Sequence, residues 1–231
     1  MRALLTVIGS YLLASVPIAY LTAKLISGID LREHGSKNVG ASNVWQTSSK
    51  LATIPVGLAQ IVQGFMGPAV AFLNGHGHAT RAAAGVAAVA GHNWSPFLRF
   101  TGGRGVGQAI GVMLAISWQA LAAFIVVSLI GVKLKAIPQF VGLGILSAPF
   151  VAKLTRQPAE IVTGLAAIAA LIFAKRLLAN EPPAKNASRS AVYLNRLLYD
   201  RDTNERDDWV TGSHTELGRK ILWKSSRTAP P

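Results

Sequence analysis

The residues best suited to chemistry are concentrated in two polar loops, and the more unusual of the two is residues 91–107, GHNWSPFLRFTGGRGVG. Gly102, Gly103 and Gly105 permit backbone conformations closed to other residues, so successive N–H groups can converge on an anion. Arg104 adds a planar fork of donors suited to phosphate, and the helix expected to begin just beyond offers its positive end. The loop therefore predicts phosphate or carboxylate binding. The alternative is that its glycines simply allow close packing between helices.

The second polar loop, residues 31–50, reads LREHGSKNVGASNVWQTSSK. Ser36, Asn38, Ser42 and Asn43 place hydroxyl and amide groups at close spacing, which could orient a polyol. Taken alone, these residues fit helix caps and turns equally well, because Ser and Asn are the usual residues there.

His92, just before the glycine-rich loop, is a candidate acid or base, although a lone His at a helix end often serves only as a cap or hydrogen-bond spacer. The glycine spacing of a nucleotide P-loop is absent, and no strand precedes the loop. The histidines at 76 and 78 have no third ligand nearby. We therefore predict neither a metal nor a cofactor.

The elements that position these loops are predicted to be membrane helices. The chain has 231 residues, 51% hydrophobic and 14% charged, with a mean hydropathy of +0.38 and no Cys. Several apolar runs reach the roughly 17–25 residues that a helix needs to cross a bilayer. The fold class expected is an all-α polytopic membrane protein with about seven spans, near 3–26, 51–73, 79–93, 105–116, 117–135, 137–154 and 158–176. The fourth and fifth could also form one helix bent near Ser117.

The net charge of +13 indicates membrane topology better than nucleic-acid binding. Residues 1–176 hold 14 Lys and Arg against three acids, and these cations lie between the apolar runs. With the N-terminus outside, ten of them face the cytoplasm and four face outward, as the positive-inside rule requires. Both polar loops then lie on the cytoplasmic side, and irregular backbone at membrane depth must be buried in protein or line a wet cavity.

The sequence divides into a transmembrane domain, residues 1–178, and a cytoplasmic segment, residues 179–231. A Pro-containing linker precedes a short amphipathic helix that includes Val192, Leu194, Leu197 and Leu198, with Arg196 expected on another face. This helix is predicted to lie on the membrane or on the inner face of the protein. The remainder, from Thr203 onward, is expected to form a loosely ordered tail.

Together the two loops resemble those of the bacterial integral-membrane acyl-phosphate:glycerol-3-phosphate acyltransferases. The family's first motif, G-S-x-N-x-G-A-T-N, is matched by Gly35, Ser36, Asn38, Gly40, Ala41, Ser42 and Asn43. Its second, G-H-x-x-P-x-F-L-x-F-K-G-G-K-G-V, is matched by Gly91, His92, Phe97, Leu98, Phe100, Gly102, Gly103, Gly105 and Val106. The resemblance covers about residues 1–180 and reaches weakly to Asn195–Leu198.

The resemblance implies transfer of an acyl chain from acyl phosphate to the sn-1 hydroxyl of glycerol 3-phosphate, in phospholipid biosynthesis at the bacterial inner membrane. The implied partners are these two substrates and membrane lipids, and nucleic acid is not among them. Ser36, Asn38 and Asn43 would contact the substrates, and His92 would orient or deprotonate the acceptor. Gly102 to Gly105, including Arg104, would bind phosphate, as would Arg196.

The chain also departs from the family pattern. Gln46, Gln60 and Gln63 replace charged residues, and Gln108 replaces a Thr. In the third motif, H-x-E-N-x-x-R-L, only Arg196 and Leu197 are in clear register, while Ser190, Val192 and Tyr193 stand where His, Glu and Asn are expected. Arg176 or Asn180 could substitute if the linker is an insertion. A related acyltransferase with another acceptor, a non-catalytic lipid-binding paralogue and, more weakly, a transporter are the alternatives.

Overall fold

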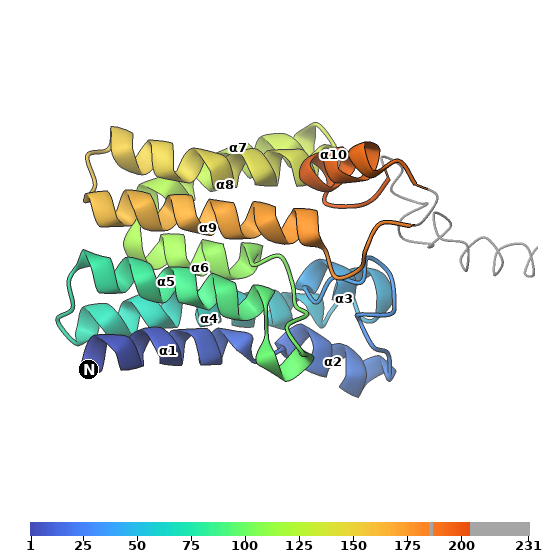
Figure 1. Cartoon of the computed structure of the whole chain (residues 1–231), viewed down its shortest axis with the longest axis horizontal. Helices are drawn as coiled ribbons and strands as arrows, with labels where there is room; N and C mark the ends of the chain where they lie inside the picture. Colours follow the sequence, from blue (N-terminus) through green and yellow to red (C-terminus); the bar gives the residue numbers. More distant parts are fainter. Residues whose placement is uncertain (185–186, 204–231) are drawn as a thin grey trace, which may run out of the picture.

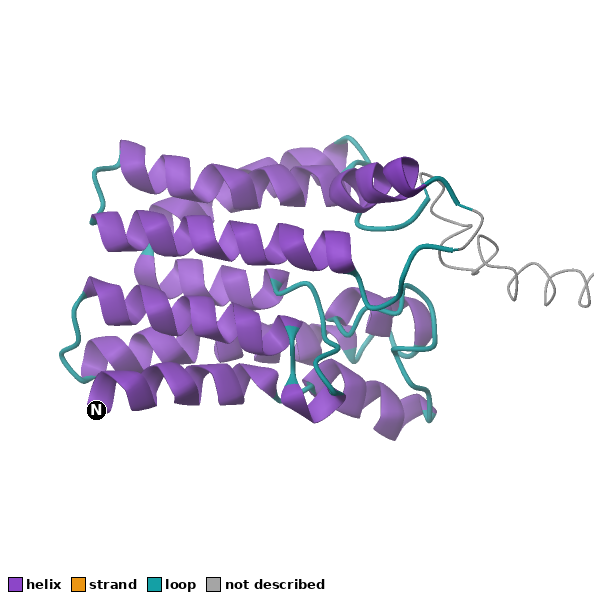
Figure 2. Cartoon of the chain, in the orientation of Figure 1, coloured by secondary structure: helices purple, strands orange, loops and turns teal. Residues whose placement is uncertain are grey.

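The computed structural model describes residues 1–184 and 187–203, and within these residues every regular element is helical (Figure 2). The α-helices are α1 (Arg2–Ser15), α2 (Ile18–Ser27), α3 (Ala41–Thr47), α4 (Thr53–Leu73), α5 (His78–Asn93), α6 (Val106–Ile116), α7 (Trp118–Lys133), α8 (Ile137–Leu154), α9 (Ala159–Leu178) and α10 (Arg189–Tyr199), with a 3₁₀ turn, η1, at Pro96–Leu98. The predicted all-α fold class is confirmed for the described residues. The tail predicted from Thr203 onward lies almost wholly outside them.

The long helices lie side by side and alternate in direction along the chain (Figure 1). The N-terminus and the α4–α5, α6–α7 and α8–α9 connections lie at one end of the bundle, which we call the opposite end. Both polar loops, the α7–α8 connection and α10 lie at the other end, which we call the motif end. The alternation brings loops that are far apart in sequence to one end of the molecule.

Four helical stretches of the described chain are long and apolar enough to cross a membrane, namely 2–27, 53–73, 137–154 and 159–178. The first is not the single helix predicted for residues 3–26, because it breaks between Ser15 and Ile18. Pro17 lacks a backbone N–H, so it cannot continue the hydrogen-bond ladder of α1. The remaining apolar helices are shorter, and the count of seven crossings stays a prediction.

α6 and α7 are separate helices, and Ser117 is the residue between them. The Ser117 side chain accepts a hydrogen bond from the backbone N–H of Ala120 at 3.3 Å and so caps α7. The alternative of one long helix through residue 117 is therefore wrong. α6 has only 11 residues, which makes it about 16 Å long.

Small residues set how closely the helices pack. A Cβ at Gly64 of α4 would collide with the backbone of Gln108, and one at Gly111 of α6 with the backbone of Ile61. The two glycines therefore let α4 and α6 approach each other closely, as is common between membrane helices. The outward faces carry large apolar side chains, including Leu58, Leu129 and Phe150, which suits contact with lipid.

α10 packs against the motif end, but not with the face that its sequence predicts. Val192 is buried as expected, whereas Leu194 and Leu198 are exposed. Arg196, expected on another face, is 2% exposed and lies one turn from Val192 on the buried side. Helical periodicity predicts an exposed Arg196, but this side chain can be buried because a carboxylate and backbone carbonyls pair with its charge and its N–H groups.

Candidate functional site

The glycine-rich loop packs tightly against the end of α5. Gly103 N donates to the carbonyl oxygen of His92 at 3.2 Å. A Cβ at Gly103 would collide with His92 Nε2, and one at Gly102 with the His92 carbonyl oxygen. Gly105 has a φ of +74°, and a Cβ there would lie 2.6 Å from Asn93 Oδ1. Close packing thus accounts for these three glycines, and their part in anion binding remains a prediction.

Arg104 points inward from this loop and is 6% exposed. Its Nε donates to Asp200 Oδ1 at 2.5 Å, and its Nη1 donates to the carbonyl oxygen of Lys175 at 3.3 Å. Asp200 ends α10, so the predicted phosphate-binding Arg104 already has a carboxylate partner from the C-terminal segment.

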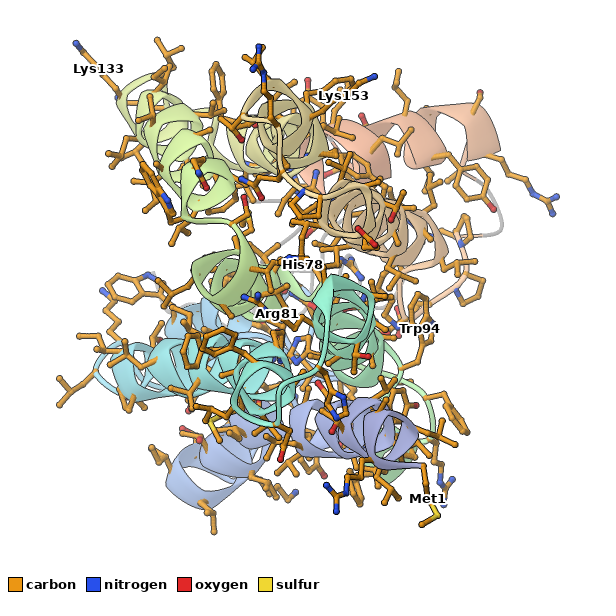
Figure 3. The ribbon with its side chains drawn as sticks, turned by 90° about the vertical axis from the view of Figure 1, so that its left-hand side faces the viewer. Met1, His78, Arg81, Trp94, Lys133 and Lys153 are labelled. Carbon is orange, nitrogen blue, oxygen red and sulfur yellow. The ribbon has the colours of Figure 1, made fainter. Side chains whose placement is uncertain are left out.

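Lys175, in the last turn of α9, is 2% exposed and has no carboxylate partner among the described residues. Its Nζ lies 5.5 Å from the centre of the Trp94 ring, which gives it a cation–π contact. In the view along the bundle, Trp94 lies at the boundary between the α5 side and the α9 side (Figure 3). Arg176, the next residue, is also 2% exposed, and its hydrogen bonds go to backbone carbonyls. Of the three buried cations Arg104, Lys175 and Arg176, only Arg104 has a carboxylate partner among the described residues.

In the first loop, the Asn43 side chain organises the backbone. Its Nδ2 donates to the carbonyl oxygens of Leu31 and His34, each at 3.0 Å, and its Oδ1 accepts from Ser36 N at 3.2 Å. Asn43 is fully buried, and all of these bonds are internal to the loop. The Ser36 hydroxyl, in contrast, bonds to no described residue. A substrate contact is therefore more readily available to Ser36 than to Asn43.

Asn180, in the linker after α9, joins the two loops. Its Nδ2 donates to the carbonyl oxygen of Lys37 at 2.9 Å and to that of Gly102 at 3.0 Å. The Oδ1 atoms of Asn180 and Asn38 are both buried and have no hydrogen-bond partner among the described residues. An unpaired buried acceptor is costly, so each of these two oxygens is available to accept a hydrogen bond from a donor group of a ligand.

The His92 side chain contacts Gln108, which in turn bonds to Gln63. Gln108 Nε2 lies 2.9 Å from His92 Nδ1 and donates to Gln63 Oε1 at 3.3 Å. Gln63 Nε2 in turn donates to the carbonyl oxygens of Leu13 and Val16, at 2.9 and 3.0 Å. His92, Gln63 and Gln108 are all buried. The side-chain amide of Gln63 therefore bonds both to the backbone at the break between α1 and α2 and to Gln108.

Arg196 is engaged entirely with protein atoms. Its Nε donates to Asp202 Oδ1 at 2.5 Å, its Nη1 to the Leu177 carbonyl at 2.8 Å, and its Nη2 to the Glu181 carbonyl at 2.9 Å. These bonds fasten α10 to the end of α9 and to the linker. Phosphate binding by Arg196 remains a prediction that this geometry does not favour.

The structure adds residues that the sequence did not single out, above all Lys175 and Asp200. Lys175 could have been noticed as a lysine that interrupts an otherwise apolar helix end. Nothing in the sequence pairs Asp200 with Arg104, which lies 96 positions earlier. The partnership of Gln108 and His92 was equally hidden, because Gln108 drew attention only as a departure from a motif.

Comparisons with known proteins identify the family of this chain. The family profile described as "Glycerol-3-phosphate acyltransferase" matches residues 4–180. The glycerol-3-phosphate acyltransferase 4 of Dehalococcoides mccartyi (strain CBDB1) is 33% identical over 223 residues, which cover 92% of this chain and 96% of the relative. The glycerol-3-phosphate acyltransferase of Desulforudis audaxviator (strain MP104C) is 43% identical over 124 residues, 52% of this chain and 61% of the relative.

A solved structure is similar as well. The crystal structure of PlsY (YgiH), an integral membrane glycerol 3-phosphate acyltransferase in its glycerol 3-phosphate form, superposes with a TM-score of 0.73 at 30% identity. The match covers 88% of this chain and 95% of that one. The chain is therefore a membrane protein that belongs to the glycerol-3-phosphate acyltransferase family.

Proposed function

We propose that the protein transfers an acyl chain from acyl phosphate to the sn-1 hydroxyl of glycerol 3-phosphate. The hydroxyl oxygen bonds to the acyl carbonyl carbon, and the bond from that carbon to the phosphate oxygen breaks. The products are lysophosphatidate, inorganic phosphate and the hydroxyl proton. Family membership supports this reaction, and acyl phosphate is already activated, so no covalent intermediate on the enzyme is required.

The observation that carries the proposal is a group of three buried cations, Arg104, Lys175 and Arg176, of which only Arg104 has a carboxylate partner among the described residues. Burying an unpaired charge is expensive, and a phosphate group would compensate the excess positive charge. Both proposed substrates carry phosphate. A phosphate that reaches Arg104 must share the guanidinium with Asp200 or displace it.

The remaining roles are proposed from which side-chain groups have no hydrogen-bond partner among the described residues. Ser36, with its unbonded hydroxyl, and Asn38, with its unpaired Oδ1, are proposed to contact the substrates. His92 is proposed to act directly on the acceptor side. Asn43 and Arg196 are proposed to act indirectly, by holding the first loop and α10 in place. Positioning and charge stabilisation then supply most of the rate acceleration.

We propose further that the motif end faces the cytoplasm of a bacterial inner membrane, with the N-terminus outside. The charge distribution supports this orientation, because ten of the 14 cations in residues 1–176 fall in the loops or helix ends assigned to that side. The division into a transmembrane domain, 1–178, and a cytoplasmic segment, 179–231, is proposed on the same grounds.

The test is a reconstituted assay. Full-length protein in detergent receives palmitoyl phosphate and glycerol 3-phosphate, and lysophosphatidate and phosphate are measured over time. We expect turnover in the wild type and a loss of about 100- to 1,000-fold in Arg104→Ala, the usual cost of removing one charge-stabilising donor. Ser36→Ala should also lose activity, whereas Lys153→Ala and Ser147→Ala, away from the motif end, should not.

The other outcomes separate the alternatives. Binding of acyl phosphate without product would indicate a different acceptor, which a screen of small phosphorylated alcohols and polyols would identify. Neither product nor binding would contradict the proposal and favour a non-catalytic lipid-binding paralogue.

A further inference from the structure

The relay from Gln63 through Gln108 to His92 determines which nitrogen of the imidazole carries a proton. The relay begins at Gln63, whose amide can be oriented in only one way. The carbonyl oxygens of Leu13 and Val16 accept but cannot donate, so the group that faces them at 2.9 and 3.0 Å must be the NH₂. Gln63 Oε1 is thereby turned toward Gln108.

The orientation of Gln108 follows from that of Gln63. Gln63 Oε1 is an acceptor, and it lies 3.3 Å from Gln108 Nε2. Rotating the Gln108 amide by half a turn would bring its own oxygen against Gln63 Oε1, which places two acceptors in contact and loses the bond. Gln108 therefore presents its NH₂ to Gln63 and, with its second N–H, to His92 Nδ1 at 2.9 Å, and its own Oε1 is buried without a partner among the described residues.

Since an amide NH₂ can only donate, His92 Nδ1 must accept, and it must be unprotonated. We infer that the Gln63–Gln108 relay holds neutral His92 in the tautomer with its proton on Nε2, which makes His92 a hydrogen-bond donor toward the substrate and not a general base. The donor role rests on the function proposed above, whereas the tautomer does not depend on it.

The position of Nε2 suits this role. Nε2 lies against Gly103, where any side chain would collide with it, and it makes no hydrogen bond to a described residue. The imidazole thus faces the glycine-rich loop with a free N–H at Gly103, the residue directly before Arg104. A second donor beside the proposed phosphate-binding residues stabilises negative charge on a substrate oxygen. The residues that impose the tautomer, Gln63 and Gln108, act as positioning residues.

The tautomer can be measured directly. Full-length protein labelled with ¹⁵N-histidine is studied by NMR in detergent, and the His92 resonances are identified by their loss in His92→Gln. We expect the one-bond ¹⁵N–¹H coupling at Nε2 alone near neutral pH. In Gln108→Glu, which replaces the donor by an acceptor of the same shape, the proton should appear on Nδ1. The matched control Gln119→Glu, at the opposite end, should leave His92 unchanged.

Activity separates a donor from a base. A glutamine at position 92 can place an N–H near the site of Nε2 but cannot take up a proton. His92→Gln is expected to stay within about tenfold of wild type, whereas His92→Ala should lose about 100- to 1,000-fold. A general base predicts equal loss in both variants.

A proton found on Nδ1, or on both nitrogens, in the wild type would overturn the inference, and so would an unchanged tautomer in Gln108→Glu. Equal inactivity of His92→Gln and His92→Ala would overturn the donor role. A wild type with its proton on Nε2 but without turnover would leave the tautomer standing and contradict the proposed function instead.

Discussion

The two ends of the bundle are held together in different ways. At the opposite end, the turns are closed by local bonds, such as His76 N to the Ala71 carbonyl at 2.9 Å, and single bonds of Arg81 and Gln157 reach the neighbouring helices α6 and α7. At the motif end, buried side chains join segments that are far apart in sequence, as Asn180 does for both loops and Arg104 does for α10.

The difference shows what each end requires. The turns at the opposite end only have to return the chain into the membrane. A site for charged substrates must instead keep polar backbone and cations at fixed positions in apolar surroundings, which only a connected network can do. We therefore expect substitutions at the motif end to change function and matched substitutions at the opposite end to change little.

Among the substitutions that compare the two ends, the largest effect should come from Lys175→Met. It removes a buried cation with no carboxylate partner, so activity should fall by about 100-fold if the ammonium binds phosphate. Without substrate, the same change should raise the melting temperature by about 2 °C or more, because an uncompensated buried charge is lost. Activity assays and thermal unfolding with and without inorganic phosphate measure both.

A Lys175→Met variant that is active and less stable would show that the lysine serves packing alone. Lys153→Met at the opposite end, where the lysine is exposed, is the matched control and should change neither quantity.

An intermediate effect is expected for Asn180→Ala. The change removes two hydrogen bonds that join the loops, each worth about 1 kcal/mol, so the KM for glycerol 3-phosphate should rise by roughly tenfold or more. The control is Asn74→Ala, which removes a single exposed bond at the opposite end. Equal KM values in the two variants would show that the loops keep their arrangement without Asn180.

The smallest effect, and the only improvement, is expected for Asp200→Asn. If substrate phosphate competes with this carboxylate for Arg104, its neutralisation should lower the KM for a phosphorylated substrate by up to about tenfold. Asp202→Asn weakens the partner of Arg196 instead and should reduce stability without lowering KM. A raised KM in Asp200→Asn would indicate that Asp200 holds Arg104 in its productive position.

Much of the architecture could be predicted from the sequence, because apolar runs and breaks depend on local composition. The helical fold and the polar loops follow from the runs and from the glycines near Gly102. The helix break at Pro17 could also be predicted from the sequence, since proline removes a backbone donor wherever it occurs. The number of crossings does not follow from composition alone, because the predicted spans 79–93 and 105–116 are short for a full crossing.

The site was harder to predict, because its bonds join residues that are distant in sequence. Gln63 and Gln108 are 45 positions apart, and the family pattern presents both only as departures, Gln63 from a charged residue and Gln108 from a Thr. In the structure they bond to each other and orient His92. Arg196 was placed on an exposed face because helical periodicity treats every charge as solvated, whereas local backbone carbonyls and Asp202 satisfy this one.

The shortness of α6 has a consequence for how the donor reaches the site. A bilayer core is about 30 Å thick, and α6 spans only about half of that depth. Because the glycine-rich loop leads directly into α6, we expect the proposed phosphate site to lie recessed beneath the lipid headgroups. An acyl chain can then react while its tail stays among the lipids. Full extraction of a sixteen-carbon tail into water would cost roughly 12 kcal/mol, at about 0.8 kcal/mol per methylene. A recessed site avoids that cost, because the water-soluble acceptor then moves into the membrane protein while the acyl tail stays among the lipids.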